Sequence, residues 1–443
     1  MPQLPEEFCT QTRQVMGEER FQRYLESFTQ EPPVSIRLNP KKCPSHLTPR
    51  TSNFEPVPWC RDAYYLRQRP NFTMDPLFHA GCYYVQEAAS MFLDEVIRQT
   101  SPIPSEGGEN FPPSPLPSKG GKQGSSPSGR LGEVVDLCAA PGGKSTLLRA
   151  ALPDDCVLYS NEPIRQRASI LLENVEKWGY DNHIVTNNYP RDYRRAKLQF
   201  DLILCDVPCS GEGMFRKDEA TIREWSPQQV EKCWRLQREI VDDAWACLAP
   251  GGVLVYSTCT FNTKENEENV RYFLEQYDDM EVVPVAVRPE WHVTGSLLPG
   301  FTAPVYRFIP GITRTEGLFM CVLRKRGTRC EVRGARLPSD AVLSANKLFS
   351  YLVPRTSHLE KKHLETNEPP RAELTYPQAI AYLRGEALQL PPDTPRGLIT
   401  VTFMGQPLGQ VKNIGTRANN HYPKEWRIRT THVPQEYEPV LDV

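Results

Sequence analysis

An apolar run that stops at a turn of small residues constrains this chain more than any other feature. Residues 134–137 are apolar apart from Asp136, residues 138–143 are small or glycine-rich, and residues 145–152 have helical character. The pattern predicts a strand, a tight loop and a helix. Small residues let a ligand approach the backbone, and the N–H groups of the first helical turn suit a carboxylate or phosphate. The segment is therefore a candidate cofactor-binding loop.

Two familiar phosphate-binding patterns do not fit this loop. Gly143-Lys144-Ser145 matches the end of a Walker A motif, but that motif needs a glycine where the chain has Cys138. The dinucleotide pattern G-x-G-x-x-G is absent from the loop as well, which disfavours a dehydrogenase. A glycine turn without any ligand is the remaining alternative, and the later motifs weigh against it.

Length and cysteine usage limit the class of protein. A chain of 443 residues can form two or three domains with a real core. Its 13 cysteines occur without C-x-x-C pairs, and the N-terminus lacks the basic and apolar parts of a signal peptide. No apolar run reaches the roughly 18 residues that span a bilayer. We therefore expect a soluble cytoplasmic protein that does not associate with a membrane.

Strands and helices alternate from residue 131 to residue 327. Further strands are predicted at 156–162, 183–188, 200–206 and 252–259, with a helix over 227–248. This alternation implies parallel pairing and right-handed crossovers, and hence an α/β fold with a doubly wound, Rossmann-like sheet. Glu162 follows the glycine loop by about 20 residues, where such folds place an acid on ribose hydroxyls. A solvated glutamate at a strand end is the alternative.

The flanking segments differ in composition. Residues 1–100 predict an N-terminal α+β subdomain, with a strand over 34–39, Arg37 on its polar face and a helix that opens at 83–91. Arg37 is either available to a phosphate or merely solvated. Residues 101–130 are rich in proline, glycine, serine and lysine, which predicts a disordered insertion.

Residues 328–443 predict a small β-rich C-terminal domain, with two strands around a glycine-containing turn over 398–411. Basic residues interleaved with aromatic ones fit RNA binding, although a solvated basic face fits the composition equally well. These residues are Lys412, Arg417, Tyr422, Lys424, Trp426, Arg427 and Arg429.

Two cysteines follow neighbouring strands of the predicted sheet. Cys209 lies just after the strand that ends at Asp206, and Cys259 lies at the end of the next predicted strand. Such strands are about 4.8 Å apart, and ligands gather at their carboxyl ends. Both thiols are therefore expected in one crevice. Inert buried cysteines are the alternative, which is weaker for two cysteines at two strand ends than for one.

Methylation at C5 of cytosine would use such a pair. A thiolate that adds to C6 makes C5 nucleophilic, and a second thiol can help to release the adduct. Asp206 would hydrogen-bond N3 and the exocyclic amine of the base, and Lys144 or a sulfonium would favour the thiolate. The residues alone leave open which cysteine attacks. The base must be unstacked, which favours single-stranded or bulged RNA.

The motifs that carry this chemistry resemble one family. Residues 136–145 (DLCAAPGGKS), 206–213 (DVPCSGEG), 256–260 (YSTCT) and 266–269 (NEEN) resemble the Sun/Fmu family of S-adenosylmethionine-dependent RNA (cytosine-5) methyltransferases. The C-terminal region, with GTRANNHYP at 415–423, is most similar to the bacterial RsmF (YebU) branch.

The resemblance implies a class I methyltransferase domain over 131–327 and a PUA-like RNA-binding domain over 328–443. It implies S-adenosyl-L-methionine as cofactor and no metal. The partner would be small-subunit (16S) ribosomal RNA, bound by a monomer.

The resemblance also assigns roles to individual residues. It makes Cys259 the nucleophile and Cys209 the residue of the release step. It places Glu162 on the ribose and Asp206 beside cofactor and base. Asn188 stands where the family usually has an aspartate near the adenine. The methionine end would contact Cys138, Ala139, Ala140, Pro141, Gly142, Gly143 and Lys144.

Three other functions remain open at this point. They are a transfer RNA cytosine-5 methyltransferase, a non-catalytic RNA-binding factor of ribosome assembly, and an S-adenosylmethionine enzyme that acts on DNA. The presence of both cysteines weighs against the RNA-binding factor, because pure binding needs neither of them.

Overall fold

The computed structural model describes residues 2–43, 54–103, 132–327, 351–352 and 369–430, together with 432, 434 and 436–441. The chain divides into two compact units. The first contains Met1–Pro33, Ala88–Leu171 and Asn182–Val353, and the second contains Val34–Glu87, Leu172–Asp181 and Pro354–Val443. The segment 1–100 thus contributes to both units. Residues 104–130 of the predicted insertion 101–130 lie outside the described residues.

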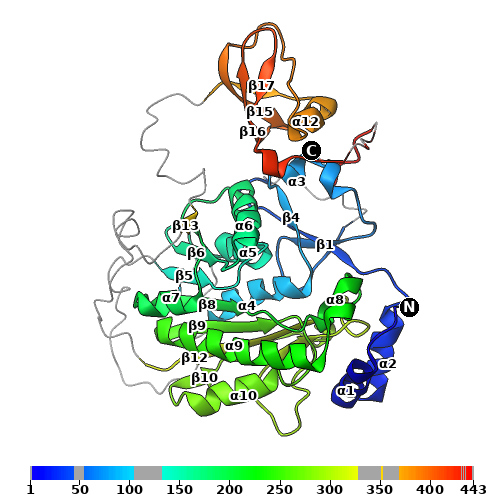
Figure 1. The fold of residues 1–443 in the computed structure, drawn as a ribbon, viewed down its shortest axis with the longest axis vertical. Helices are drawn as coiled ribbons and strands as arrows, with labels where there is room; N and C mark the ends of the chain where they lie inside the picture. The colour runs from blue at the N-terminus through cyan, green and yellow to red at the C-terminus, as the bar shows by residue number, and fades with distance from the viewer. Residues whose placement is uncertain are drawn as a thin grey trace. The chain divides into compact units, whose positions relative to one another are not determined.

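Unit 1 is organised around one large sheet (Figure 1). Five central strands are parallel, in the order β9-β8-β5-β6-β7, which confirms the doubly wound α/β prediction. Antiparallel strands flank them on both sides. The strands are β5 (Glu133–Asp136), β6 (Val157–Asn161), β7 (His183–Thr186), β8 (Phe200–Asp206), β9 (Leu248–Thr258), β10 (Met280–Val282), β11 (Tyr306–Phe308), β12 (Leu318–Lys325) and β13 (Tyr351–Leu352).

Apolar sequence explains the position of the central strands. β8 is buried over nearly its whole length, as expected for a strand covered on both faces. One face of the sheet packs against α7, α9 and α10, whose apolar side chains join those of β5, β8 and β9 in a single core. On another part of the sheet, Phe92 of α4 packs against Tyr306 and Phe308 of β11. These helices are α4 (Phe92–Thr100), α7 (Pro190–Arg195), α9 (Pro227–Cys247) and α10 (Glu267–Gln276).

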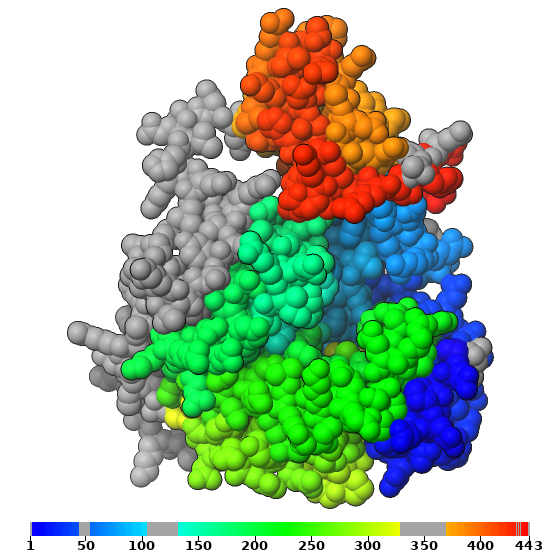
Figure 2. All heavy atoms as spheres, in the orientation of Figure 1, coloured from blue at the N-terminus to red at the C-terminus, as the bar shows by residue number. Residues whose placement is uncertain are grey.

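The two N-terminal helices also belong to unit 1. α1 (Glu6–Met16) and α2 (Glu18–Ser27) bury Phe8 and Tyr24 in a core shared with Phe215 and Phe261, which lie close after the two cysteines in the sequence. Tyr24 and Phe261 meet edge to face, with ring centroids 5.3 Å apart. Figure 2 shows these helices, in dark blue, against the green surface that includes α8 (Glu219–Glu224). The N-terminal helices therefore pack against the segments that follow Cys209 and Cys259.

Unit 2 combines two four-stranded sheets. In the first, β1 pairs with β3 and β4, so the prediction of a helix opening at 83–91 is wrong for its first residues. Tyr83–Val85 completes the sheet, and α4 begins only at Phe92. The elements are β1 (Val34–Leu38), β2 (Phe54–Pro56), β3 (Ala63–Leu66), α3 (Pro76–His79) and β4 (Tyr83–Val85).

Arg37 of β1 is not on a polar face. Its side chain is buried, Nε donates to Gln86 Oε1 at 3.0 Å, and the guanidinium lies 4.5 Å from the ring centroid of Trp178. Trp178 ends α6 (Arg165–Trp178), a helix that begins in unit 1. The proposed exposure to a phosphate or to solvent is therefore wrong, because tertiary packing covers this strand on both faces.

The second sheet of unit 2 contains the predicted hairpin. β15 and β16 are antiparallel and turn at Met404 and Gly405, whose φ angles of 50° and 73° suit a tight hairpin turn. Lys412, Arg417, Lys424 and Arg429 are exposed, whereas Tyr422 is buried against Tyr382 and Trp426. The elements are β14 (Arg371–Glu373), α12 (Tyr376–Leu383), β15 (Gly397–Phe403), β16 (Gln406–Asn413) and β17 (Ala418–Asn420).

Within the described ranges, no helix is both long enough and apolar enough to cross a membrane.

Candidate active site

The glycine loop joins β5 to α5 (Gly143–Ala151) at the carboxyl edge of the parallel sheet. Gly142 has a φ of 116°, a conformation that favours glycine and turns the chain into the helix. Ala139 N donates to Asn161 O at 2.8 Å, and Thr146 Oγ1 donates to Gly142 O at 2.8 Å. Both ends of the loop are thereby fixed. Burial raises the pKa of Cys138 well above its usual range, so this residue is a neutral part of the loop.

Asn161 links three strand ends and was not singled out from the sequence. Its Nδ2 donates to Leu137 O at 3.0 Å and to Asn188 O at 2.9 Å, and its Oδ1 accepts from Asn188 N at 3.0 Å. One buried amide therefore holds the ends of β5, β6 and β7 in register. The signal in the sequence is a polar residue that ends a run of strand-forming residues beside Glu162.

Glu162 lies at the end of β6 with its side chain almost fully buried. Its Oε1 accepts from Ile164 N at 3.0 Å, and its Oε2 lies 3.4 Å from Arg167 Nη1. Arg167 also donates through Nη2 to Ala140 O at 3.0 Å, so it connects Glu162 to the glycine loop. The structure thus brings Glu162 and Asn188 to the same edge as residues 138–144. A buried carboxylate beside backbone N–H groups fits the ribose and the charged end of S-adenosyl-L-methionine.

Two large exposed side chains stand next to these polar residues. Ile164 is 53% exposed and Tyr189 is 55% exposed, although both belong to residue types that usually pack inside. They follow Glu162 and Asn188 closely in the chain. Apolar surface at this position suits the flat ring of an adenine. Neither residue was predicted from the sequence.

Asp136 ends β5 and forms a hydrogen bond with the first turn of α5. It is completely buried, and Ser145 Oγ donates to its Oδ2 at 2.6 Å. Burial raises the pKa of Asp136 to about 7, even though the hydrogen bond from Ser145 acts in the opposite direction. The nearby charge of Asp206 adds to the increase. Asp136 therefore connects β5 to the first turn of α5.

Asp206 ends β8 and is held from both sides. Lys144 Nζ donates to Asp206 Oδ2 at 2.9 Å, and Ser257 Oγ donates to Oδ1 at 2.6 Å. Ser257 is the residue of β9 that pairs with Asp206 in the sheet. Burial alone would lower the pKa of Lys144, but the charge of Asp206 and its hydrogen bond raise it. Lys144 is thus a stable cation beside the carboxylate.

Cys209 and Cys259 lie together although they are 50 residues apart. Their Sγ atoms are 3.1 Å from one another, and Cys259 N donates to Cys209 Sγ at 3.3 Å. Both residues are partly accessible. The hydrogen bond with Cys259 and then burial raise the pKa of Cys209 well above its usual range, and the charge of Cys259 adds to this. Cys209 is therefore a neutral thiol that can donate to Cys259 Sγ.

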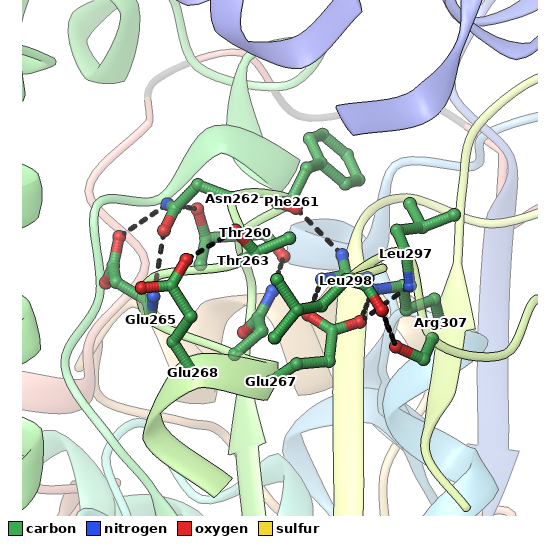
Figure 3. Close-up of polar contacts among 12 residues, drawn as sticks. Thr260, Phe261, Asn262, Thr263, Glu265, Glu267, Glu268, Leu297, Leu298 and Arg307 are labelled. Carbon is green, nitrogen blue, oxygen red and sulfur yellow. Dashed lines mark hydrogen bonds and ion pairs between the residues drawn. The ribbon is translucent and has the colours of Figure 1, made fainter. Parts of the chain in front are cut away.

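Buried carboxylates tie the two cysteine loops together and were not expected from the sequence. Glu212 Oε2 accepts from Phe261 N at 2.7 Å and from Asn262 N at 2.9 Å. Glu265 Oε2 accepts from Ser210 N at 3.0 Å, and Asn262 Nδ2 donates to Glu265 Oε1 at 2.8 Å (Figure 3). Each glutamate therefore belongs to one cysteine loop and holds the other.

Comparisons with known proteins place the chain in a family. Family models described as the N-terminal domain of 16S rRNA methyltransferase RsmF, 16S rRNA methyltransferase RsmB/F, and methyltransferase RsmF PUA domain match residues 4–88, 130–324 and 369–428. Ribosomal RNA small subunit methyltransferase F of Cronobacter sakazakii is 29% identical, over 88% of this chain and 89% of that protein. The protein of the same name from Klebsiella pneumoniae is 28% identical, over 95% and 96%.

Solved structures agree on the fold. A methyltransferase homolog protein from Pyrococcus horikoshii is 25% identical, with a TM-score of 0.56 over 72% of this chain and 95% of that chain. NSun6 from Pyrococcus horikoshii, solved with the ligand SFG, gives a TM-score of 0.55 at 19% identity over 73% and 99%. The parallel sheet of unit 1 and the solved structures thus indicate the same methyltransferase fold, and the three family models all describe ribosomal RNA methyltransferases. The chain belongs to the RsmF family of methyltransferases, and its cofactor is S-adenosyl-L-methionine.

Proposed function

We propose that this chain transfers a methyl group to C5 of a cytosine in RNA through a covalent adduct with Cys259. The observation that carries the proposal is the distance of 3.1 Å between the sulfur atoms of Cys209 and Cys259 at the cofactor edge. Methylation of an oxygen or an exocyclic nitrogen needs no such pair of thiols. Carbon 5 of cytosine does, because it becomes nucleophilic only after a thiolate has added to C6.

Each residue at the edge has a role in this reaction. The thiolate of Cys259 forms a bond to C6, and the electron pair of the C5–C6 double bond moves to C5. Asp206 accepts a hydrogen bond from the exocyclic amine of the base, and Lys144 stabilises negative charge at the thiolate. Residues 138–144 would hold S-adenosyl-L-methionine, which would supply the electrophilic methyl group that C5 takes up and would leave as S-adenosylhomocysteine.

Cys209 acts after methyl transfer. Carbon 5 then carries both a methyl group and a proton, and loss of the proton to a base restores the C5–C6 double bond. The same step breaks the bond between Sγ of Cys259 and C6. In the adduct Cys259 is a thioether, so its charge no longer raises the pKa of Cys209. With its pKa lowered, Cys209 can lose its own proton to solvent and then, as a thiolate, take the proton from C5.

The assignment of Cys259 as the attacking residue has support beyond the family resemblance. Cys209 is held as a neutral thiol by its hydrogen bond with Cys259 and by burial. A thiol held in its neutral form is a poor nucleophile, because the thiolate is the form that attacks. The asymmetry between the two sulfurs thus favours attack by Cys259 and a later role for Cys209.

We propose small-subunit ribosomal RNA as the substrate. The curated relatives are named ribosomal RNA small subunit methyltransferases, and a PUA domain model matches residues 369–428. Exposed Lys412, Arg417, Lys424 and Arg429 give unit 2 cations that suit phosphates. A single chain supplies every group named above, so the enzyme is proposed to act as a monomer in the cytoplasm.

A covalent trap tests the proposal. RNA that contains 5-fluorocytosine cannot lose the C5 substituent as a proton, so the intact enzyme with cofactor should form a complex that survives denaturing electrophoresis. Cys259→Ala should abolish it, while Cys233→Ala on α9 should not. Absence of the complex with the intact enzyme would leave the fold as an RNA-binding factor. Labelling of DNA in preference to RNA with a radioactive methyl group would reject the RNA substrate.

A further inference from the structure

The two peptide units that flank Cys209 are held by one pair of buried side chains. Gln237 Nε2 of α9 donates to Pro208 O at 2.9 Å, before the cysteine, and Ser210 N donates to Glu265 Oε2 at 3.0 Å, after it. Gln237 Nε2 also donates to Glu265 Oε2 at 2.7 Å, which closes the arrangement. Both side chains are fully buried. The backbone of Cys209 is thereby fixed on both sides.

The direction of each hydrogen bond in this cluster is determined by its surroundings. Gln237 cannot exchange its amide ends, because its Oε1 accepts from Tyr256 OH at 3.1 Å and from Asn269 Nδ2 at 2.9 Å. Asn262 is fixed in the same way, since its Oδ1 accepts from Glu265 N at 2.9 Å and its Nδ2 donates to Glu265 Oε1. Position 265 must therefore accept hydrogen bonds on both side-chain oxygens.

Cys259 is held mainly by other groups. Glu212 accepts the backbone N–H groups of Phe261 and Asn262, and Asn266 Nδ2 donates to Thr260 O at 2.9 Å. Thr258 Oγ1 in turn donates to Asn266 Oδ1 at 2.6 Å. Loss of the Glu265 carboxylate would leave these contacts in place. Its direct effect falls on the loop that carries Cys209.

We infer that Glu265, together with Gln237, is a positioning residue that holds the Cys209 thiol at the reacting base and so sets the rate of adduct release. This inference rests on the proposed role of Cys209 in that step. Burial and the charge of Glu212 raise the pKa of Glu265 to about 7, while the donors from Ser210, Asn262 and Gln237 lower it. These three donors thus compensate the burial of the carboxylate.

The test separates adduct formation from adduct release. Glu265→Met removes both acceptor oxygens at similar side-chain length, and Glu268→Met is the matched control. Glu268 lies in the first turn of α10, three residues after Glu265, and its Oε1 accepts from Thr263 Oγ1 at 2.8 Å. With ordinary cytosine RNA, Glu265→Met should accumulate covalent complex and release product about 100-fold more slowly, the effect of a reactive group displaced by about 1 Å.

The conservative variant should rescue part of the effect. Glu265→Gln can keep one acceptor toward Ser210 N and Gln237 Nε2 while it loses the bond from Asn262, so release should slow by only about fivefold. This variant also retains the fold if Glu265→Met proves too unstable to purify. Gln237→Met should repeat the behaviour of Glu265→Met, because it frees Pro208 O from the other side.

Trapping by 5-fluorocytosine RNA depends on attack by Cys259 and does not use Cys209 as a base. A general loss of structure would slow trapping as well as release. The trapping rate should stay within about twofold of the intact enzyme in both Glu265 variants, well inside the change expected for release. Equal loss of trapping and release, or release as fast as that of Glu268→Met, would overturn the inference. If the intact enzyme itself forms no trapped complex, the proposed function fails instead, and the two failures are distinguishable.

Discussion

Lys144 Nζ lies 2.9 Å from Asp206 Oδ2, which joins the first turn of α5 to the end of β8. The pair is mostly shielded from solvent, with 14% of the Lys144 side chain and 30% of the Asp206 side chain exposed. The charge of Cys259 is among the causes that raise the pKa of Lys144, so the ammonium also acts on that thiol. One cation thus pairs with Asp206 and also interacts with Cys259.

The first prediction concerns this cation. Lys144→Met removes the cation that pairs with Asp206 and acts on Cys259, so negative charge on the attacking sulfur is less stabilised. Trapping by 5-fluorocytosine RNA should slow about 10- to 100-fold, the range expected when one nearby charge is removed. The measurement is the trapping rate at one fixed pH. Lys232→Met, on the exposed face of α9, is the control, and a trapping rate equal to that of the intact enzyme would reject this role.

The second prediction concerns Cys209. Cys209→Ala leaves Cys259 able to attack but removes the base for the C5 proton, so the methylated RNA should stay attached. Denaturing electrophoresis with ordinary cytosine RNA should show a covalent complex that the intact enzyme does not accumulate. The double variant Cys209→Ala/Cys259→Ala should show none. Normal turnover by Cys209→Ala would remove the release step from this residue.

The third prediction concerns a buried ion pair beneath the Cys259 loop. Arg307 Nε donates to Glu267 Oε1 at 2.7 Å, Arg307 Nη1 donates to Phe261 O at 2.8 Å, and both side chains are nearly inaccessible (Figure 3). Glu267→Gln leaves a buried guanidinium without its counter-charge. The free energy of unfolding should fall by about 3–5 kcal/mol in a urea titration.

A double-variant cycle checks that interpretation. The double variant Arg307→Met/Glu267→Met removes both charges at once. Its loss of stability should be smaller than the sum of the losses in Arg307→Met and Glu267→Met. Additive losses would show that the two side chains contribute independently. Such a result would contradict the ion pair as the source of the effect.

The fourth prediction follows from the raised pKa of Asp136. The folded protein binds this proton more tightly than the unfolded chain, because burial raises the pKa of Asp136 to about 7. The associated stability is complete below about pH 4 and is lost as the pH rises toward about 7. Asp136→Asn removes the titration, so its stability relative to the intact protein should increase over that range, by at most about 1.4 kcal/mol per pH unit.

Unfolding by urea at several pH values measures this difference. Ser145→Ala provides a second check, because the hydrogen bond from Ser145 lowers the pKa of Asp136. Without that bond, the upper end of the transition should move to higher pH. Parallel curves for the intact protein and Asp136→Asn would contradict the assignment.

Local sequence was sufficient for the parts of this protein that local physics controls. The period of apolar residues predicted the central strands, and the small residues at 138–143 predicted a tight loop before a helix. The glycine at 405 predicted the C-terminal hairpin, whose two central residues adopt positive φ. Parallel pairing of the central strands also follows from alternating strands and helices, which imply crossover connections.

Predictions from local sequence were wrong where the burial of a residue depends on segments far away in the chain. Arg37 looks like a polar residue of a half-exposed strand, yet Gln86 and Trp178 enclose it. Tyr83–Val85 looks like the start of a helix because its neighbours are helix formers, but pairing with β1 makes it a strand. Tertiary contacts override local preference in both cases.

The sequence by itself determined that two cysteines follow two neighbouring strands, because each cysteine is a few residues from a strand that its own apolar run defines. Only the tertiary structure decided how the thiols are held. Glu265 lies in a polar stretch that reads as a solvated helix start, and its burial arises from Gln237 on α9 and Ser210 beyond β8. Whether a carboxylate is solvated or fixed in a network depends on which segments pack around it, and that information is spread over the whole chain.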